Sequence, residues 1–156
     1  MFRLNRLTDY AVVVMAQLSA GSKPLSSAQQ IAHETGVPLP TVAKVLNVLT
    51  REGLVTSHRG AAGGYTLTRP ATEIPVSDII EALEGPIALT ACVDTAGGCE
   101  VGSICPMRGT WDKVNKAIET ALKGVTLHDM ITSGPLPAAF ADGPFGANAT
   151  PASGAR

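Results

Sequence analysis

The sequence predicts a mainly α-helical protein that carries one β-hairpin and one cysteine-containing loop. Three observations support this prediction. Apolar residues recur at helical spacing along most of residues 8–131, a glycine-rich turn separates two short β-type runs, and all three cysteines fall between positions 92 and 105. With 156 residues, 45% of them hydrophobic, the chain is long enough to bury a core.

Two amphipathic helices are predicted near the start of the chain. The first covers residues 8–20, where apolar side chains recur at i, i+3, i+4 and i+7. The second begins at Ser26, with Gln29 three residues later as its capping-box partner. Gly36 is well placed to close this helix in the left-handed conformation.

A third helix is predicted from Pro40, which suits a first helical position, to Glu52. Its apolar stripe leaves an outward side that includes Thr41 and Lys44. Two helices joined by a short turn describe helix-turn-helix geometry, in which the second helix reads the major groove of DNA. Many small helical bundles share this pattern and bind nothing, so the next segment matters.

That segment predicts a narrow hairpin with strands at residues 54–58 and 64–68. The glycines between the strands permit positive φ and close backbone approach. Arg59 stands at the tip beside Gly60, where it can enter a narrow minor groove. Together with the preceding helices, the hairpin predicts a winged helix-turn-helix over residues 1–70. The alternative is an ordinary hairpin with a solvated arginine.

The charge distribution favours nucleic-acid contact by the first part of the chain only. The net charge is −1, but residues 1–70 carry seven basic and three acidic side chains, whereas residues 71–133 carry four and nine. This split is expected when one region meets phosphate, although an excess of this size also arises by chance. No apolar run reaches about 18 residues, so no membrane helix is expected and a cytoplasmic protein is predicted.

The rest of the chain is predicted to form three regions. Residues 71–105 hold a connecting helix that stops at Gly85, followed by the cysteine loop. Residues 106–132 hold a long helix that begins at Pro106 and a short last helix. The long helix has an apolar seam from Trp111 to Val125 with coiled-coil-like spacing, which favours dimerisation. Residues 133–156 have no periodicity and are predicted to be a disordered tail.

The three cysteines form a candidate metal site. Thiolates are soft ligands that suit an iron–sulfur cluster or zinc, and an odd number of cysteines without an export signal fits a reducing compartment. Cys105 directly precedes the predicted helix, whose dipole favours the thiolate. Three unrelated free thiols are the alternative. No fourth cysteine exists, and the other side chains that remain open as a fourth ligand are Asp9, His58, Asp94, Glu100 and His128.

Several segments match a known family. They are residues 7–11, Leu54-Val55 with Ser57, residues 59–65, residues 79–85, and the three cysteines followed by Trp111. On these segments the chain, over about residues 1–133, resembles the Rrf-type winged-helix regulators, the family of IscR, NsrR, RirA and the regulators of SUF iron–sulfur assembly genes. The opening stretch and residues 105–108 are most similar to the SUF regulators.

The resemblance implies a homodimeric DNA-binding regulator, with repression favoured, that senses iron–sulfur cluster status and controls SUF-type genes. It implies Cys92, Cys99 and Cys105 as ligands of a [2Fe–2S] or [4Fe–4S] cluster, with Asp9 of the partner chain as fourth ligand. It also implies that Arg59 contacts the minor groove of a palindrome-like operator and that the exposed side of residues 41–44 contacts its major groove.

Three departures from the family pattern bear on these roles. Arg108 stands where IscR-like members have a histidine, and a guanidinium cannot bind a metal. The first cysteine gap is one residue longer, and Ala43-Lys44 replace acidic and amide residues. The alternatives are a nitric-oxide- or iron-responsive regulator of the same family and a zinc-binding or thiol redox-sensing DNA-binding protein. An enzyme is not expected, because the chain has no Cys-x-x-Cys, phosphate loop or Ser-His-Asp arrangement.

Overall fold

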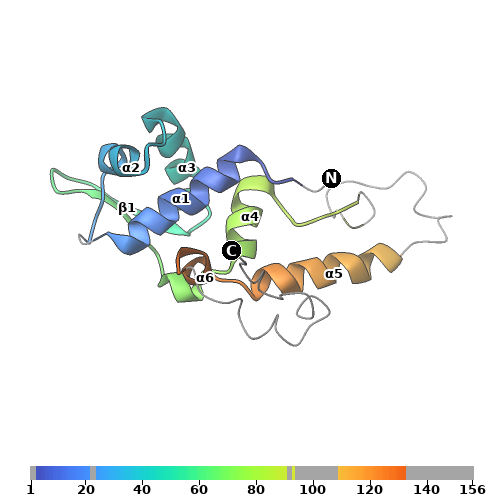
Figure 1. The fold of residues 1–156 in the computed structure, drawn as a ribbon. Coiled ribbons are helices and arrows are strands. Elements are labelled where there is room, and N and C mark those ends of the chain that lie inside the picture. Colours follow the sequence, from blue (N-terminus) through green and yellow to red (C-terminus); the bar gives the residue numbers. More distant parts are fainter. Residues whose placement is uncertain (1–2, 22–23, 91–92, 94–108, 133–156) are drawn as a thin grey trace, which may run out of the picture.

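A computed structural model describes residues 3–21, 24–90, 93 and 109–132. Within these ranges the chain is mainly helical, with one two-stranded antiparallel sheet (Figure 1). In chain order the elements are α1 (Arg6–Ala20), α2 (Ala28–Thr35), α3 (Leu39–Arg51), β1 (Val55–His58), β2 (Gly64–Leu67), the 3-10 helix η1 (Ala71–Glu73), α4 (Val76–Glu84), α5 (Thr110–Lys123) and α6 (Leu127–Ile131). The predicted fold class is confirmed.

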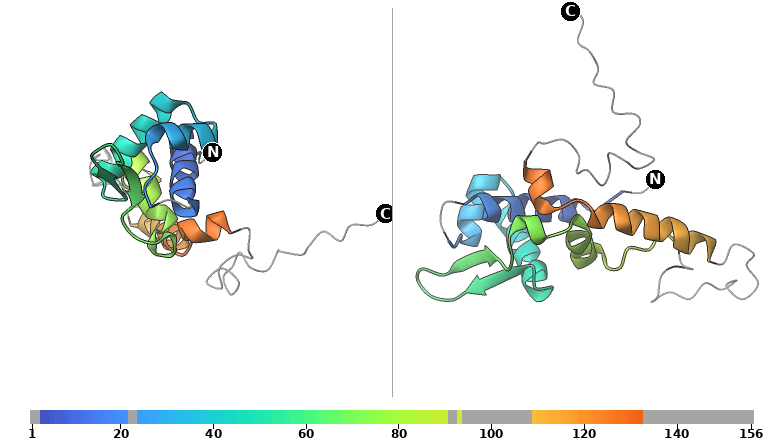
Figure 2. Two further views of the ribbon diagram at one scale, coloured as in Figure 1. Left: turned by 90° about the vertical axis from the view of Figure 1, so that its left-hand side faces the viewer. Right: turned by 90° about the horizontal axis from the view of Figure 1, so that it is seen from below.

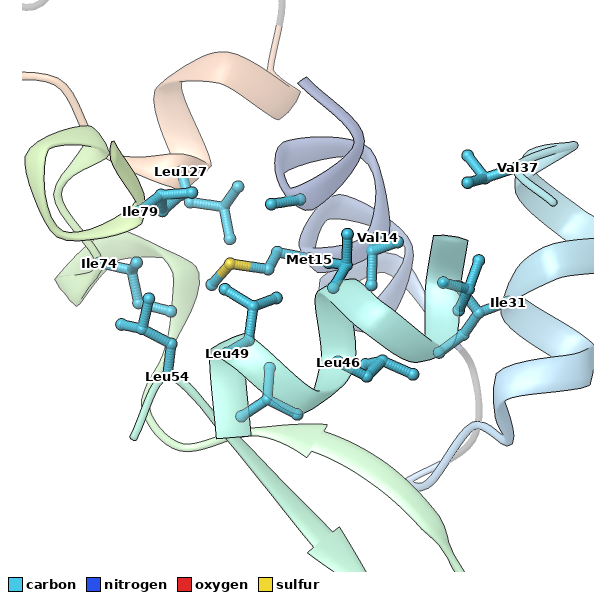
Figure 3. Packing of buried hydrophobic residues seen from close by; sticks show 14 of the residues in the cluster. Val14, Met15, Ile31, Val37, Leu46, Leu49, Leu54, Ile74, Ile79 and Leu127 are labelled. Atoms are coloured by element: carbon cyan, nitrogen blue, oxygen red, sulfur yellow. The ribbon is translucent and has the colours of Figure 1, made fainter. Parts of the chain in front are cut away.

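One apolar core joins the N-terminal helices to later elements. Met15 of α1 lies at its centre, between Leu49 of α3 and Ile79 of α4 (Figure 3). The buried members of this core are Ala11, Val14, Met15, Ile31, Val37, Val42, Val45, Leu46, Leu49, Leu54, Val55, Ala71, Ile74, Ile79 and Leu127. Full burial of one such large side chain contributes about 1.5 to 3 kcal/mol. The helix-turn-helix and the elements after the hairpin therefore share one core.

The starts of the first three helices differ from the predicted ones by one or two residues. α1 begins at Arg6, because the Asn5 side chain accepts a hydrogen bond from the Leu7 N–H and caps the helix. The predicted Ser26 cap is wrong, since Ser27 caps α2 and forms the capping box with Gln30. Pro40 takes the second rather than the first position of α3, which begins at Leu39.

The reason for the shifted cap is a backbone pairing between Ser26 and the hairpin. The Ser26 N–H donates to the Tyr65 carbonyl at 3.1 Å, and the Tyr65 N–H donates to the Ser26 carbonyl at 2.9 Å. Gly64 lies against the same segment, where a Cβ would come within 2.8 Å of the Ser26 oxygen. The residues before α2 therefore brace the hairpin, and the backbone can approach so closely only because Gly64 has no side chain.

Helices α4 and α5 form a second, smaller contact zone. Val76 and Ile80 of α4 pack with Ile118 and Leu122 of α5. The Val76 N–H donates to the Val125 carbonyl, which brings the end of α5 to the start of α4.

In α6, hydrogen bonds from the Thr126 side chain and backbone hold the pKa of Asp129 below its usual range. This cap is therefore present at neutral pH and is lost as pH falls through the lowered pKa.

The start of α5 corrects a prediction. The helix begins at Thr110, preceded by Gly109 in the left-handed conformation with φ +81, and not at Pro106. Its predicted end at Gly124 is confirmed. Trp111 and Val114 in its first half are 40% and 42% exposed, and this half extends away from the body of the molecule (Figure 2). None of the described helices is both long and apolar enough to cross a membrane.

The close approach at Gly64 gives a stability prediction. Gly64→Ala forces the new Cβ against the Ser26 backbone, so we expect the free energy of unfolding to fall by about 1 to 3 kcal/mol. Urea unfolding followed by circular dichroism measures this change. Ala62→Ser adds one heavy atom at the exposed tip of the same hairpin and should change stability by less than about 0.5 kcal/mol. Equal effects of the two variants would contradict the packing argument.

Candidate DNA interface and cluster site

The outward side of α3 carries the predicted major-groove residues. Val42, Val45 and Leu49 are fully buried and fix the rotation of the helix about its axis. Lys44 is consequently exposed, and Thr41 is half-buried one turn before it. Asn47 and Arg51 are exposed further along the helix. The structure thus brings Thr41 and Lys44 together on one solvent-facing side of α3.

The turn between α2 and α3 sets the angle of this helix pair. Gly36 closes α2 with φ +72, a left-handed conformation that its lack of a Cβ permits, as predicted. Val37 is buried in the core, and its N–H donates to the hydroxyl of Thr35. The turn is therefore anchored by a buried side chain, as a helix-turn-helix requires for a fixed second helix.

The hairpin presents the other predicted DNA-contacting residues. Arg59 and Gly60 are both exposed in the turn between β1 and β2, at the end of the molecule away from α5 (Figures 1 and 2). Gly60 has φ +116, and its carbonyl accepts a hydrogen bond from the Gly63 N–H at 3.0 Å. A Cβ on Gly63 would come within 2.3 Å of the His58 carbonyl. The glycines thus make a tight turn that holds the Arg59 backbone at the tip.

Asn115 of α5 is a site residue that the sequence analysis missed. It is 3% exposed, and its amide donates to the Ile87 carbonyl at 2.7 Å while its oxygen accepts from the Leu89 N–H at 3.1 Å. Glu119 accepts a further hydrogen bond from the same amide. The sequence contained one indication of this role, a polar asparagine next to the apolar seam of the predicted long helix. This contact, the Asn115 clamp, fixes the segment that leads into the cysteines.

Glu84 makes a second contact that local patterns did not indicate. One oxygen of its carboxylate accepts hydrogen bonds from the Asn5 N–H and the Thr8 hydroxyl, both at 2.6 Å. Thr8 is 1% exposed, so its hydroxyl depends on this partner. The end of α4 is thereby tied to the start of α1, where Asp9 is exposed.

The predicted ligands are only partly within the described ranges. Cys92, Cys99 and Cys105 lie outside them, as do Asp94, Glu100 and Arg108. The candidates that the structure does describe are on separate elements, Asp9 on α1, His58 on β1 and His128 on α6. Residues 3–21, 24–90, 93 and 109–132 contain no group of three or more His, Cys, Asp or Glu suited to a metal. The ligand set therefore stays a prediction based on the chemistry of three thiols.

The start of α5 also corrects the predicted position of Cys105 at the first turn of the long helix. Helix α5 begins at Thr110, five positions after Cys105, and Cys105 itself lies outside the described residues.

Comparison with known proteins identifies the family. A sequence model of the Rrf2 family, described as iron-dependent transcriptional regulator, matches residues 4–133. The chain belongs to the Rrf2 family. It is 30% identical over 135 residues to the HTH-type transcriptional regulator IscR of Escherichia coli, a match that covers 84% of this chain and 81% of that protein. It is 33% identical to Protein aau3 of Rhizobium meliloti, covering 85% of this chain and 87% of the relative.

Solved structures agree with this assignment for the Rrf2-family chain. The IscR of T. potens superposes with a TM-score of 0.62 at 32% identity, covering 85% of this chain and 88% of that one. CymR, described as the global cysteine regulator of B. subtilis, gives a TM-score of 0.65 at 26% identity, with 86% and 100% covered. The chain is therefore a winged-helix transcriptional regulator, and its relatives are DNA-binding proteins, not enzymes.

The Asn115 clamp gives the second prediction. Asn115→Ala leaves the Ile87 carbonyl and the Leu89 N–H without their partner, so we expect a loss of about 1 to 3 kcal/mol in unfolding free energy. Limited proteolysis should also cleave faster near residues 86–90. Lys116→Ala removes an exposed neighbour on the same helix and serves as the control. Unchanged cleavage in Asn115→Ala would show that other contacts hold this segment.

Proposed function

We propose that this Rrf2-family chain is a cytoplasmic homodimeric repressor that binds an iron–sulfur cluster through Cys92, Cys99 and Cys105 and controls SUF-type iron–sulfur assembly genes. The observation that carries the proposal is the Asn115 clamp. It joins the segment before the cysteines to α5 through two backbone hydrogen bonds. A change in the cysteine segment thus has a direct mechanical path to α5.

DNA binding is assigned to α3 and the hairpin. Lys44 and Thr41 read base edges in the major groove, while Arg59 enters the adjacent minor groove with Gly60 permitting close backbone approach. The exposure of Lys44, Arg59 and Gly60 supports these roles. Two copies related by a twofold axis bind half-sites about one DNA turn apart, so the operator is palindrome-like.

Dimerisation is assigned to the first half of α5. The apolar seam of this helix continues through Trp111 and Val114 beyond the part that packs on α4, and these side chains are 40% and 42% exposed. A second copy of the helix covers them and buries the seam. This arrangement places the start of α5, which follows the cysteines in the chain, at the dimer interface.

The cofactor assignment depends on the donor set and on the family. Three thiolates suit a [2Fe–2S] or [4Fe–4S] cluster, and the family description, iron-dependent transcriptional regulator, supports iron over zinc. Asp9 of the partner chain is the proposed fourth ligand. It is exposed near the start of α1, within one turn of the Glu84 contact. In this proposal, α5 takes different positions in the cluster-bound and the cluster-free dimer. The two recognition helices shift with it, and the affinity for the operator changes as a result.

A thiol-responsive regulator is the second candidate. A solved structure described as the oxidized form of Staphylococcus aureus CymR is similar to this chain, with 27% identity and a TM-score of 0.60. In this alternative the cysteines respond to oxidation directly and bind no iron. A regulator that responds to nitric oxide or to iron supply is a variant of the first candidate. It uses the same cluster ligands and differs only in the signal that it detects.

The DNA contacts are tested by two variants with different expected signatures. Arg59→Ala should weaken operator binding by about 1 to 3 kcal/mol, with the larger losses at sites whose minor groove is narrow. Lys44→Ala should change the preferred base at one operator position by a similar amount, about 1 to 3 kcal/mol. Binding titrations with a duplex selected in vitro by the unmodified protein measure both.

Lys123→Ala, which removes an exposed cation at the end of α5, is the control and should bind normally. Uniform weakening over all sequences by Lys44→Ala would assign Lys44 to a phosphate and contradict its proposed role in base reading. Normal binding by Arg59→Ala would remove the wing from the interface.

The cofactor prediction is tested on protein purified without oxygen. We expect iron, acid-labile sulfide and visible absorption, and we expect operator affinity to differ at least about fivefold between loaded and cluster-free protein. Replacement of each cysteine by serine should abolish the absorption. Zinc instead of iron, or metal-free protein whose DNA binding responds to oxidant, would favour the thiol-responsive candidate.

A further inference from the structure

A hollow on the surface joins the start of α1 to the start of α3. Arg6 and Tyr10 line it from α1, and Pro40, Thr41 and Lys44 line it from α3. Tyr10 packs its ring on the main core and is half-buried, so its position is fixed. The α3 wall of this hollow contains the two residues to which base reading is assigned. The hollow therefore lies at the edge of the proposed DNA interface.

Three donor side chains at the hollow, those of Arg6, Tyr10 and Lys44, have no hydrogen-bond or ion-pair partner among the described residues. Among the described residues, Arg6 and Lys44 take part in no ion pair, whereas Arg51, Arg69 and Lys123 each lie within 4.0 Å of an acidic side chain. Within the same ranges, the hydroxyl of Tyr10 makes no hydrogen bond. Arg6 and the Tyr10 phenol converge on one surface hollow beside the exposed Lys44, and such donors favour an anion with several acceptor oxygens.

No acidic side chain is among the described residues that line this hollow. Asp9 follows Arg6 by three positions, and Glu84 contacts Asn5, but neither carboxylate is part of the lining. The charged residues of the lining are Arg6 and Lys44. The wall of the hollow therefore presents positive charge where α1 meets α3.

We propose that this hollow binds a phosphate of the DNA backbone at the edge of the major groove, with Arg6 as the charged contact and Tyr10 as a hydroxyl donor. The inference rests on the proposed DNA binding, because the α3 wall that reads bases requires a strand to pass beside the hollow. Phosphate contacts carry no sequence information but fix the register of the recognition helix. In this proposal, Arg6 and Tyr10 position α3 on the DNA by binding a phosphate, and Lys44 contacts the base edges.

The test compares Arg6→Gln and Tyr10→Phe with Lys123→Gln, which removes one exposed positive charge from the end of α5. The probes are a duplex selected from a random library by the unmodified protein and a duplex of mixed sequence, each titrated over a series of salt concentrations. Arg6→Gln should weaken binding to both duplexes by about tenfold. It should also lower the slope of log affinity against log salt by about 1.8, because each subunit of the dimer loses one phosphate contact.

Tyr10→Phe keeps the ring and removes only the hydroxyl, so we expect about a threefold loss on both duplexes and an unchanged unfolding midpoint. Lys123→Gln should leave affinity and slope unchanged. A second selection with Arg6→Gln should return the same preferred sequence.

Two results would overturn the inference while leaving DNA binding intact. In the first, the salt slope of Arg6→Gln equals that of the unmodified protein. In the second, the selected sequence changes, which would make Arg6 a base reader. Failure of the unmodified protein to bind any selected duplex would instead overturn the proposed function, and the inference with it.

Discussion

The packing of α1 against two sets of helices is the constraint on which the rest of the structure depends. Met15 is fully buried, with Leu49 of α3 on one side and Ile79 of α4 on the other (Figure 3). Loss of such a side chain leaves a cavity that costs about 2 to 5 kcal/mol. Because both sets of helices meet the same side chains, the recognition helix cannot rotate independently of α4. The DNA-facing elements therefore share one apolar core with α4, the helix that precedes the cysteines.

The hairpin is joined to that body through backbone atoms. Two hydrogen bonds between Ser26 and Tyr65 add Ser26, two residues before α2, to the edge of β2. Backbone pairing of this kind tolerates many side chains but requires glycine wherever chains approach closely, as at Gly63 and Gly64. The glycines of the wing therefore have two separate tasks. Gly60 supplies a positive φ at the tip, while the other two supply space.

Local pattern was enough for the helices and strands, but it was not enough for their junctions. Apolar spacing placed α1, α3 and α4 within two residues, because burial of one face is a periodic property of sequence. The cap of α2 was placed one residue early, because Ser26 and Ser27 are equivalent locally and only the distant Tyr65 distinguishes them. Asn115 and Glu84 act on residues 26 and 79 positions away, respectively, so no short window contains either contact. For the three cysteines, the sequence predicted which side chains could bind a metal, but not how these side chains are arranged in space.

These two distant contacts determine how a change at the cysteines can reach DNA. Glu84 ties the end of α4 to the start of α1, and the Asn115 clamp ties residues 87–89 to α5. The connector between them is only a few residues long, so both anchors act on one short segment. A displacement of residues 87–89 must either break the hydrogen bonds of Asn115 or move α5 with it. Helix α5 packs on α4, and α4 shares the core of α1 and α3. Movement of α5 therefore requires a small motion of whole helices. Such motion changes the spacing of two recognition helices in a dimer far more than it changes either reading surface.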